Sequence, residues 1–195
     1  FDTGSGGSRE TYVAGNAVLL AVRDAKTQLL TTAAALVEAL EGDVQLSNGR
    51  VSVVGSPDQG LSIREIAAAA YRKAGGPILG RGSFVATAPV GPVFAAHFVE
   101  VEVDVETGQV QVLRYLAAHD LGKTINRTAT SGQIEGGAAQ GIGFGLMEEM
   151  VFDNGIVQNP NFVDYKIPMA LDLPNIEAMM VEDTLGQGPF GAKSI

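Results

Sequence analysis

The residues with the clearest potential for chemistry lie in a glycine-rich stretch, residues 132–150. One row at four-residue intervals consists of Gln133, Gly137, Gly141 and Gly145. Apolar residues recur at the same interval, which predicts a helix. Because each glycine costs a helix about 0.8–1 kcal/mol relative to alanine, the row indicates close approach by a neighbour, either another helix or a flat ligand. Gln133 would add an amide at the mouth of this helix, where backbone N–H groups lack partners.

A second candidate is the glycine–serine loop of residues 1–11, which contains Gly6, Gly7 and Ser8 and precedes a predicted helix. Successive N–H groups in such a loop, followed by a helix N-terminus, can bind an anion. The loop lacks the Gly-Lys-Ser/Thr of a P-loop, and Arg9 stands where a dinucleotide fingerprint needs its third glycine. A flexible tail is the alternative interpretation.

Other candidate side chains are few. His97 and His119 are far apart in sequence, so we expect hydrogen-bonded structural roles rather than a metal site. Ser8 and Ser194 lack the Gly-x-Ser-x-Gly context of a hydrolase nucleophile. Lys193 is either an anion partner or an ordinary surface lysine. We therefore assign no metal ligand and no catalytic residue within the chain.

Composition excludes several classes of protein. The 195 residues, 46% of them hydrophobic, suffice for one full domain. A net charge of −9 argues against nucleic acid or an anionic membrane as partner. Without cysteine, the chain alone holds neither a disulfide nor an iron–sulfur cluster. No run of about 18 apolar residues predicts a transmembrane helix, and we expect a cytoplasmic protein. Both ends resemble cuts through a longer protein.

Two helices are expected in the first half of the chain. Apolar residues at spacings of three and four predict one over residues 12–40, with Gly42 as its stop. Ser62 and Glu65 form a capping box at the start of the other, which should end near Ala74.

Strands are expected in four places, one of them a hairpin around Asp153-Asn154-Gly155. Residues 44–54 alternate around an Asn-Gly pair, which predicts a hairpin. Residues 93–118 predict a second hairpin, with one valine-lined face buried and one acidic face in solvent. Residues 176–182 predict a last strand after the irregular, proline-containing segment 159–175. We therefore predict a single α+β domain over residues 1–195, with mixed sheets, β-hairpins and packed helices.

Five separated motifs occur in an order that resembles one family. They are Gly6-Gly7-Ser8-Arg9-x-Thr11 before Gly15-Asn16-Ala17-Val18; His119-Asp120-Leu121-Gly122-Lys123-x-Ile125-Asn126; Gly132-Gln133-Ile134-Glu135-Gly136 with Gln140-Gly141-x-Gly143; Asn161-Phe162-x-Asp164-Tyr165-Lys166-Ile167-Pro168; and Gly191-Ala192-Lys193-Ser194-Ile195. Together they resemble the C-terminal part of the molybdenum-binding large subunit of the xanthine dehydrogenase / aldehyde oxidase family, over essentially the whole chain.

The resemblance implies a molybdopterin cofactor, in mononucleotide or dinucleotide form, held between glycine-rich loops from several segments of the large subunit. The residues that it implies in cofactor binding are Gly6, Gly7, Ser8, Arg9, Thr11 and Gln133. The first five would line the pterin and its phosphate, and Gln133 would hydrogen-bond at the molybdenum end. Glu10 departs from the small hydroxyl residue of the family pattern.

The resemblance also implies a function, the oxidative hydroxylation of an N-heterocycle (xanthine-like) or an aldehyde. A general-base glutamate is expected two residues after Ile195, outside this chain. The 2Fe–2S centres and FAD are expected on other segments or subunits, so the partners would be the remainder of the large subunit and iron–sulfur and flavin subunits, in an oligomer. Carbon monoxide dehydrogenase and aryl-CoA reductase are alternatives within the family. Outside it, a non-catalytic packing or interaction domain is the alternative.

Overall fold

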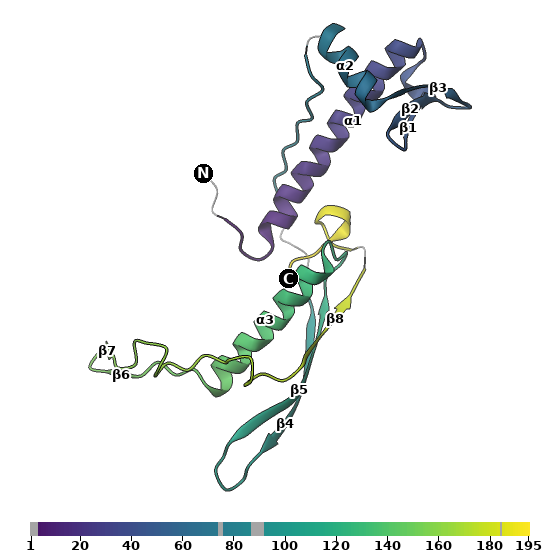
Figure 1. The fold of residues 1–195 in the computed structure, drawn as a ribbon. Coiled ribbons are helices and arrows are strands. Elements are labelled where there is room, and N and C mark those ends of the chain that lie inside the picture. Colours follow the sequence, from purple (N-terminus) through teal and green to yellow (C-terminus); the bar gives the residue numbers. More distant parts are fainter. Residues whose placement is uncertain (1–3, 74–75, 87–91, 184) are drawn as a thin grey trace. The chain divides into compact units, whose positions relative to one another are not determined.

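A computed structural model describes residues 4–73, 76–86, 92–183 and 185–195 (Figure 1). The chain divides into two compact units, one comprising Arg9–Ala88 and the other Phe1–Ser8 together with Pro89–Ile195. Helices pack with two three-stranded sheets and a short hairpin, which confirms the predicted α+β class. A single domain over residues 1–195 stays a prediction.

The long helix of the first unit is α1 (Gly15–Val37), which continues from a π-helical turn, η1 (Glu10–Ala14). Its apolar spacing predicted this helix correctly, but the predicted stop at Gly42 is wrong. The chain leaves the helix at Glu38, which adopts a left-handed conformation with φ of 55° while its N–H donates to Ala34. A helix end of this geometry usually uses glycine.

The first unit also contains an antiparallel sheet and a second helix. Its elements are η2 (Glu41–Asp43), β1 (Val44–Ser47), β2 (Arg50–Val53), β3 (Ser56–Ser62) and α2 (Ile63–Lys73). Asn48 and Gly49 both have positive φ, as a two-residue hairpin turn requires, so the predicted hairpin is confirmed. The predicted end of α2 near Ala74 lies outside the described residues.

The predicted capping box of α2 is confirmed. The N–H of Ser62 donates to Glu65 Oε2 at 2.8 Å, and the N–H of Glu65 donates to Ser62 Oγ at 3.2 Å. Helices and sheet enclose one core, whose buried residues are Leu29, Ala33, Ala34, Val44, Val51 and Ile66. Residues 76–86 run along α1 (Figure 1), where Gln28 exchanges two hydrogen bonds with the backbone of Leu79.

The second unit is built on a sheet of order β4-β5-β8. Its elements are β4 (Ala95–Val103), β5 (Val110–Asp120), α3 (Arg127–Leu146), β6 (Phe152–Asp153), β7 (Ile156–Val157), β8 (Ile176–Val181) and η3 (Pro189–Gly191). β4 and β5 form the predicted hairpin, and β8 lies parallel to β5, with α3 in the connection between them. The predicted strand at 176–182 and the irregular segment at 159–175 are both confirmed.

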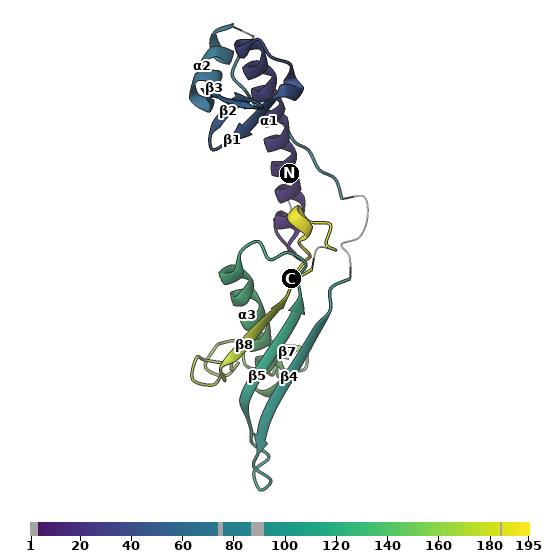
Figure 2. The same ribbon diagram turned by 90° about the vertical axis from the view of Figure 1, so that its right-hand side faces the viewer.

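The predicted burial of the valine face of β4 is wrong for this chain. Val99, Val101 and Val103 are 47–49% exposed. The reason is coverage, since α3 packs on β5 and β8 and the far part of the β4–β5 hairpin extends beyond the helix (Figures 1 and 2). The core of the unit lies instead around Ala117, Leu121 and Ile134.

Two expectations about the glycine-rich helix also need correction. α3 begins at Arg127, where Asn126 Oδ1 caps it by accepting from the N–H of Ala129 at 3.0 Å. Gln133 therefore lies in the second turn and not at the mouth. A Cβ atom added at Gly137, Gly141 or Gly145 would meet nothing within 4 Å, so the expected close neighbour is absent from the described chain. The helix that the apolar row predicted is confirmed, and Ile134, Ala138 and Ile142 of that row are buried.

The glycine of α3 that the fold requires is Gly143. A Cβ atom there would lie 2.7 Å from Pro168 Cδ and 2.9 Å from its Cγ, and 2.3 Å from Glu148 Oε1. The segment containing Pro168 is held in this place because the Tyr165 hydroxyl donates to Glu148 Oε2 at 2.6 Å. The chain that returns from the β6–β7 hairpin thus packs directly on the helix backbone.

We expect Gly143→Ala and Gly141→Ala to have opposite effects on stability. The first overpacks the contact with Pro168 and should lower the free energy of unfolding by about 1–3 kcal/mol. The second adds a methyl group in open space and should raise it by about 0.8–1 kcal/mol through helix propensity. Chemical denaturation of the two variants beside wild type measures both values. Equal effects would contradict the assignment of Gly143.

Candidate functional site

The glycine–serine loop at the start of the chain has a backbone that few residues adopt. Gly4, Gly7 and Ser8 have φ of 75°, 58° and 60°. A Cβ atom at Gly4 or Gly6 would meet nothing within 4 Å, so there is open space beside both glycines. The loop leads along the chain into η1, which confirms the predicted order of loop and helix.

Two serines join this loop to the other end of the chain. Ser8 Oγ accepts a hydrogen bond from the N–H of Ile195 at 3.0 Å and donates one to the Ile195 carbonyl at 3.1 Å. Ser194 Oγ donates to the carbonyl of Gly7 at 2.6 Å. We call these four residues, Gly7, Ser8, Ser194 and Ile195, the serine latch. It brings together segments 187 residues apart in sequence.

The residue before the latch, Lys193, is bound on two sides. Its Nζ donates to Asp120 Oδ2 at 2.6 Å and to Asp183 Oδ2 at 3.1 Å, and only 7% of its side chain is exposed. The hydrogen bond to Asp120 raises the pKa of Lys193 above its ordinary value. The N–H of Leu185, and then Lys193, hold the pKa of Asp183 below its ordinary value. Lys193 is thus a buried, ion-paired cation and not a surface lysine.

Backbone hydrogen bonds also join the end of β5 to the C-terminal segment. The N–H of Lys193 donates to Leu121 O at 2.9 Å, and that of Lys123 donates to Gly191 O at 3.0 Å. Gly122 lies between these two bonds with φ of 60°. A Cβ atom on Gly122 would come within 2.2 Å of Gly191 O, so the close approach requires glycine. These contacts hold the last residues of the chain against the end of β5.

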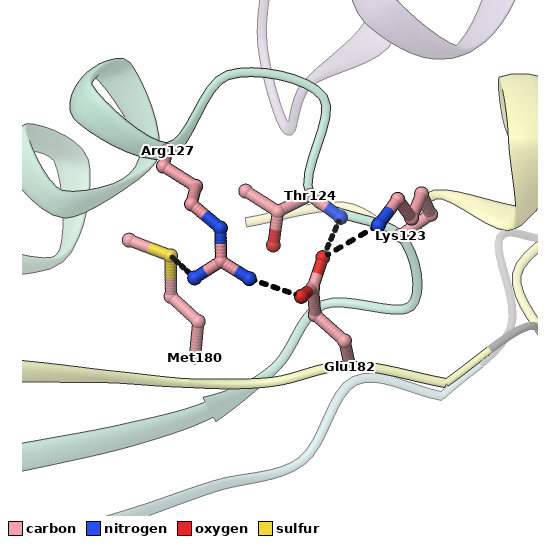
Figure 3. A network of polar contacts seen from close by, with 5 residues as sticks. All are labelled: Lys123, Thr124, Arg127, Met180 and Glu182. Atoms are coloured by element: carbon pink, nitrogen blue, oxygen red, sulfur yellow. Dashed lines mark hydrogen bonds and ion pairs between the residues drawn. The ribbon is translucent and has the colours of Figure 1, made fainter.

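A carboxylate that the sequence analysis missed fixes the turn before α3 (Figure 3). Glu182 Oε1 accepts from the N–H of Thr124 at 2.9 Å and from Lys123 Nζ at 3.4 Å, while Oε2 accepts from Arg127. The bond from Thr124 is the main reason that the pKa of Glu182 lies below its ordinary value. No sequence signal marks this residue, because its partners lie more than fifty positions away.

Comparison with known proteins identifies the family. Residues 1–174 match the family model described as the molybdopterin cofactor-binding domain. The chain belongs to this family. It is 35% identical over 199 residues to the xanthine dehydrogenase molybdenum-binding subunit of Escherichia coli O157:H7, covering 100% of this chain and 26% of that subunit. It is 29% identical to the carbon monoxide dehydrogenase large chain of Afipia carboxidovorans, covering 25% of it.

Solved structures agree. Quinoline 2-oxidoreductase from Pseudomonas putida 86 superimposes with a TM-score of 0.87 and 28% identity over 100% of this chain and 26% of that one. The Cu,Mo-CO dehydrogenase superimposes with a TM-score of 0.87 and 29% identity, covering 100% of this chain and 25% of that one. The chain spans about a quarter of the length of these relatives. The predicted resemblance and the molybdopterin class of cofactor are thereby confirmed.

The molybdopterin-binding domain presents features that fit its cofactor. The open space beside Gly6 leaves room for a phosphate to approach the backbone of the loop. Gln133 is exposed on α3, beside glycines that leave the helix surface open. Arg9, which pairs with Glu10 at 3.1 Å, and Thr11, which is exposed, lie in the other unit. Of the predicted site residues, the structure joins Gly7 and Ser8 to the C-terminal segment, and Gln133 lies on α3.

The two histidines of the domain form a hydrogen-bonded group, as predicted. His97 Nε2 lies 3.1 Å from His119 Nε2, and His97 Nδ1 lies 2.9 Å from the Tyr115 hydroxyl. Burial, and then the charge of His97, lower the pKa of His119. Among the described residues, no three histidine or carboxylate side chains gather as a metal site. Likewise, no described helix is long and apolar enough to cross a membrane.

We expect His119 to make stability depend on pH. Because its folded pKa lies below the unfolded value of about 6.5, the unfolded state binds the proton first as pH falls. The contribution of neutral His119 to folding stability is therefore present above about pH 6.5 and lost as pH falls through the folded pKa. Between about pH 7.5 and 5, the midpoint temperature of thermal unfolding should fall less steeply for His119→Gln than for wild type. Identical slopes would show that His119 is not the titrating group.

Proposed function

We propose that this domain helps to hold molybdopterin within a longer large subunit that hydroxylates a small molecule oxidatively. The observation that carries the proposal is the serine latch, in a chain that belongs to the molybdopterin cofactor-binding domain family. The latch joins the glycine–serine loop, suited to an anion, to the segment that should lead to the catalytic glutamate. The latch would then hold the loop that binds the cofactor beside the segment that leads to the catalytic base.

Each candidate residue has a role within this proposal. Gly6 and Gly7 would offer backbone N–H groups to the cofactor phosphate. The hydroxyl of Ser8 already bonds the backbone of Ile195, so Ser8 would contribute its own N–H and not its side chain. Arg9 and Thr11 would support the phosphate from the start of η1. Gln133 would hydrogen-bond at the molybdenum end, from the open face of α3.

When bound, the molybdenum of the cofactor supplies the redox and Lewis-acid chemistry. The residues of this chain bind and orient, and the general base that moves the proton is the glutamate expected two residues after Ile195 in the longer polypeptide. Iron–sulfur centres and FAD would lie on other segments or subunits. Relatives named as a large subunit, a large chain and a complex subunit support partner subunits in an oligomer.

The relatives favour an N-heterocycle as substrate. A nicotine 6-hydroxylase large subunit from Paenarthrobacter nicotinovorans is 34% identical to this chain, and the xanthine dehydrogenase subunit is 35% identical. A carbon monoxide dehydrogenase chain is 29% identical and an aldehyde oxidoreductase 26%. We therefore propose a xanthine-like or pyridine-like ring, with aldehyde, carbon monoxide and aryl-CoA as the alternatives. A cytoplasmic location stays a prediction.

A non-catalytic packing domain is the competing function, and metal content separates the two. In the full-length protein, elemental analysis should find molybdenum and denaturation should release a fluorescent pterin. A full-length protein without either would overturn the proposal.

Gln133→Ala tests the proposed contact at the molybdenum end. The change removes one hydrogen bond, so cofactor content or turnover in the full-length protein should fall roughly two- to tenfold, while the unfolding midpoint stays unchanged. Gln111→Ala, which removes an exposed amide from β5, is the matched control and should alter neither. Complete loading and full turnover in Gln133→Ala would exclude this role for the residue.

A further inference from the structure

We propose that Lys193 is a positioning residue, which sets the place of the C-terminal segment and, through the serine latch, that of the glycine–serine loop. The inference rests on the proposed function, since it names the device that would align the two halves of the cofactor site. Lys193 itself touches neither cofactor nor substrate in this account. It acts on the residues that do.

The first support is the pairing of the lysine. Lysine is almost never fully buried unless it is paired, and Lys193 meets two carboxylates from different segments. Asp120 is the last residue of β5, and Asp183 follows the end of β8. The ammonium group therefore fastens the C-terminal segment to two adjacent strands of one sheet.

The second support is that both the side chain and the backbone of Lys193 are fixed. Its side chain is held by the two aspartates, and its backbone N–H donates to Leu121 O. Few rotations then remain between this residue and the next, because each residue contributes only two soft dihedrals. Ser194 and Ile195 follow immediately, and these are the residues that bond Gly7 and Ser8.

The third support is electrostatic. Both aspartate oxygens converge on one Nζ, at 2.6 and 3.1 Å. Without the cation, the two carboxylates that now share it would be left close together, and like charges at such a distance disfavour the arrangement. An apolar side chain of equal length would fill the space and still release the segment. The site requires a cation that donates in two directions.

The chain offers a matched control in Lys123. It lies in the same region, its Nζ reaches a carboxylate, Glu182, at 3.4 Å, and 53% of its side chain is exposed. Exposed pairs of this kind contribute little. Removing the charge of Lys123 changes net charge by the same amount as removing that of Lys193, without releasing the C-terminal segment.

The test compares Lys193→Met, Asp183→Asn and Lys123→Met in the full-length protein, with amide hydrogen exchange followed at Ile195, whose N–H donates to Ser8 Oγ. Asp183→Asn keeps the pair with Asp120, so it guards against loss of the fold in Lys193→Met. We expect exchange at Ile195 to accelerate about tenfold or more in the first two variants, and less than about twofold in Lys123→Met. Unchanged exchange in Asp183→Asn and Lys193→Met would overturn the proposal.

Two further readouts separate a positioning role from a merely structural one. In the loaded protein, kcat should fall with KM unchanged, because in this proposal the C-terminal segment positions the catalytic base and not the substrate. Ser8→Ala combined with Asp183→Asn should accelerate exchange at Ile195 no further than Ser8→Ala alone. Fully additive effects would overturn the link through the latch. Molybdenum absent from wild type would overturn the proposed function instead, and exchange at Ile195 is measured without the metal.

Discussion

A buried ion pair is the constraint on which the candidate site depends. Lys193 lies between Asp120 and Asp183 with 7% of its side chain exposed, and Asp120 is 73 positions away from it in sequence. Buried charges are costly unless they are paired, so the pairing favours the arrangement in which the strand ends and the C-terminal segment meet at Lys193. The serine latch then extends that arrangement to the glycine–serine loop.

The proposed function rests on the segments that this arrangement brings together. A loop with exposed backbone suits a phosphate, and the segment bonded to it is the one from which a catalytic base should follow. In the proposed function the domain would contribute geometry and the cofactor would contribute reactivity, a division that is general for cofactor enzymes. The glycine face of α3 and the valines of β4 are left uncovered within the described chain, which spans about a quarter of the length of its relatives.

Features determined by neighbours in sequence were predictable. The Asn48-Gly49 turn and the capping box of Ser62 depend on two to four consecutive residues, and both were placed correctly. The start of α3 was missed because its cap, Asn126, precedes the apolar pattern that predicted the helix. The roles of Lys193 and Glu182 could not be predicted at all. Their partners lie up to 73 positions away, and only the folded sheet brings them together.

The claim that the C-terminal segment is held against the glycine–serine loop is tested most directly by disulfide trapping of the latch. The chain contains no cysteine, and a Cβ atom at Gly7 would lie 3.8 Å from Ser194 Oγ, within reach of a disulfide after a small adjustment. Gly7→Cys with Ser194→Cys should oxidise to a single intramolecular disulfide, whereas Gly137→Cys with Ser194→Cys serves as the control pair. A thiol count that falls to zero in the first protein is the predicted result. Two free thiols that persist under oxidation in that protein would contradict the account.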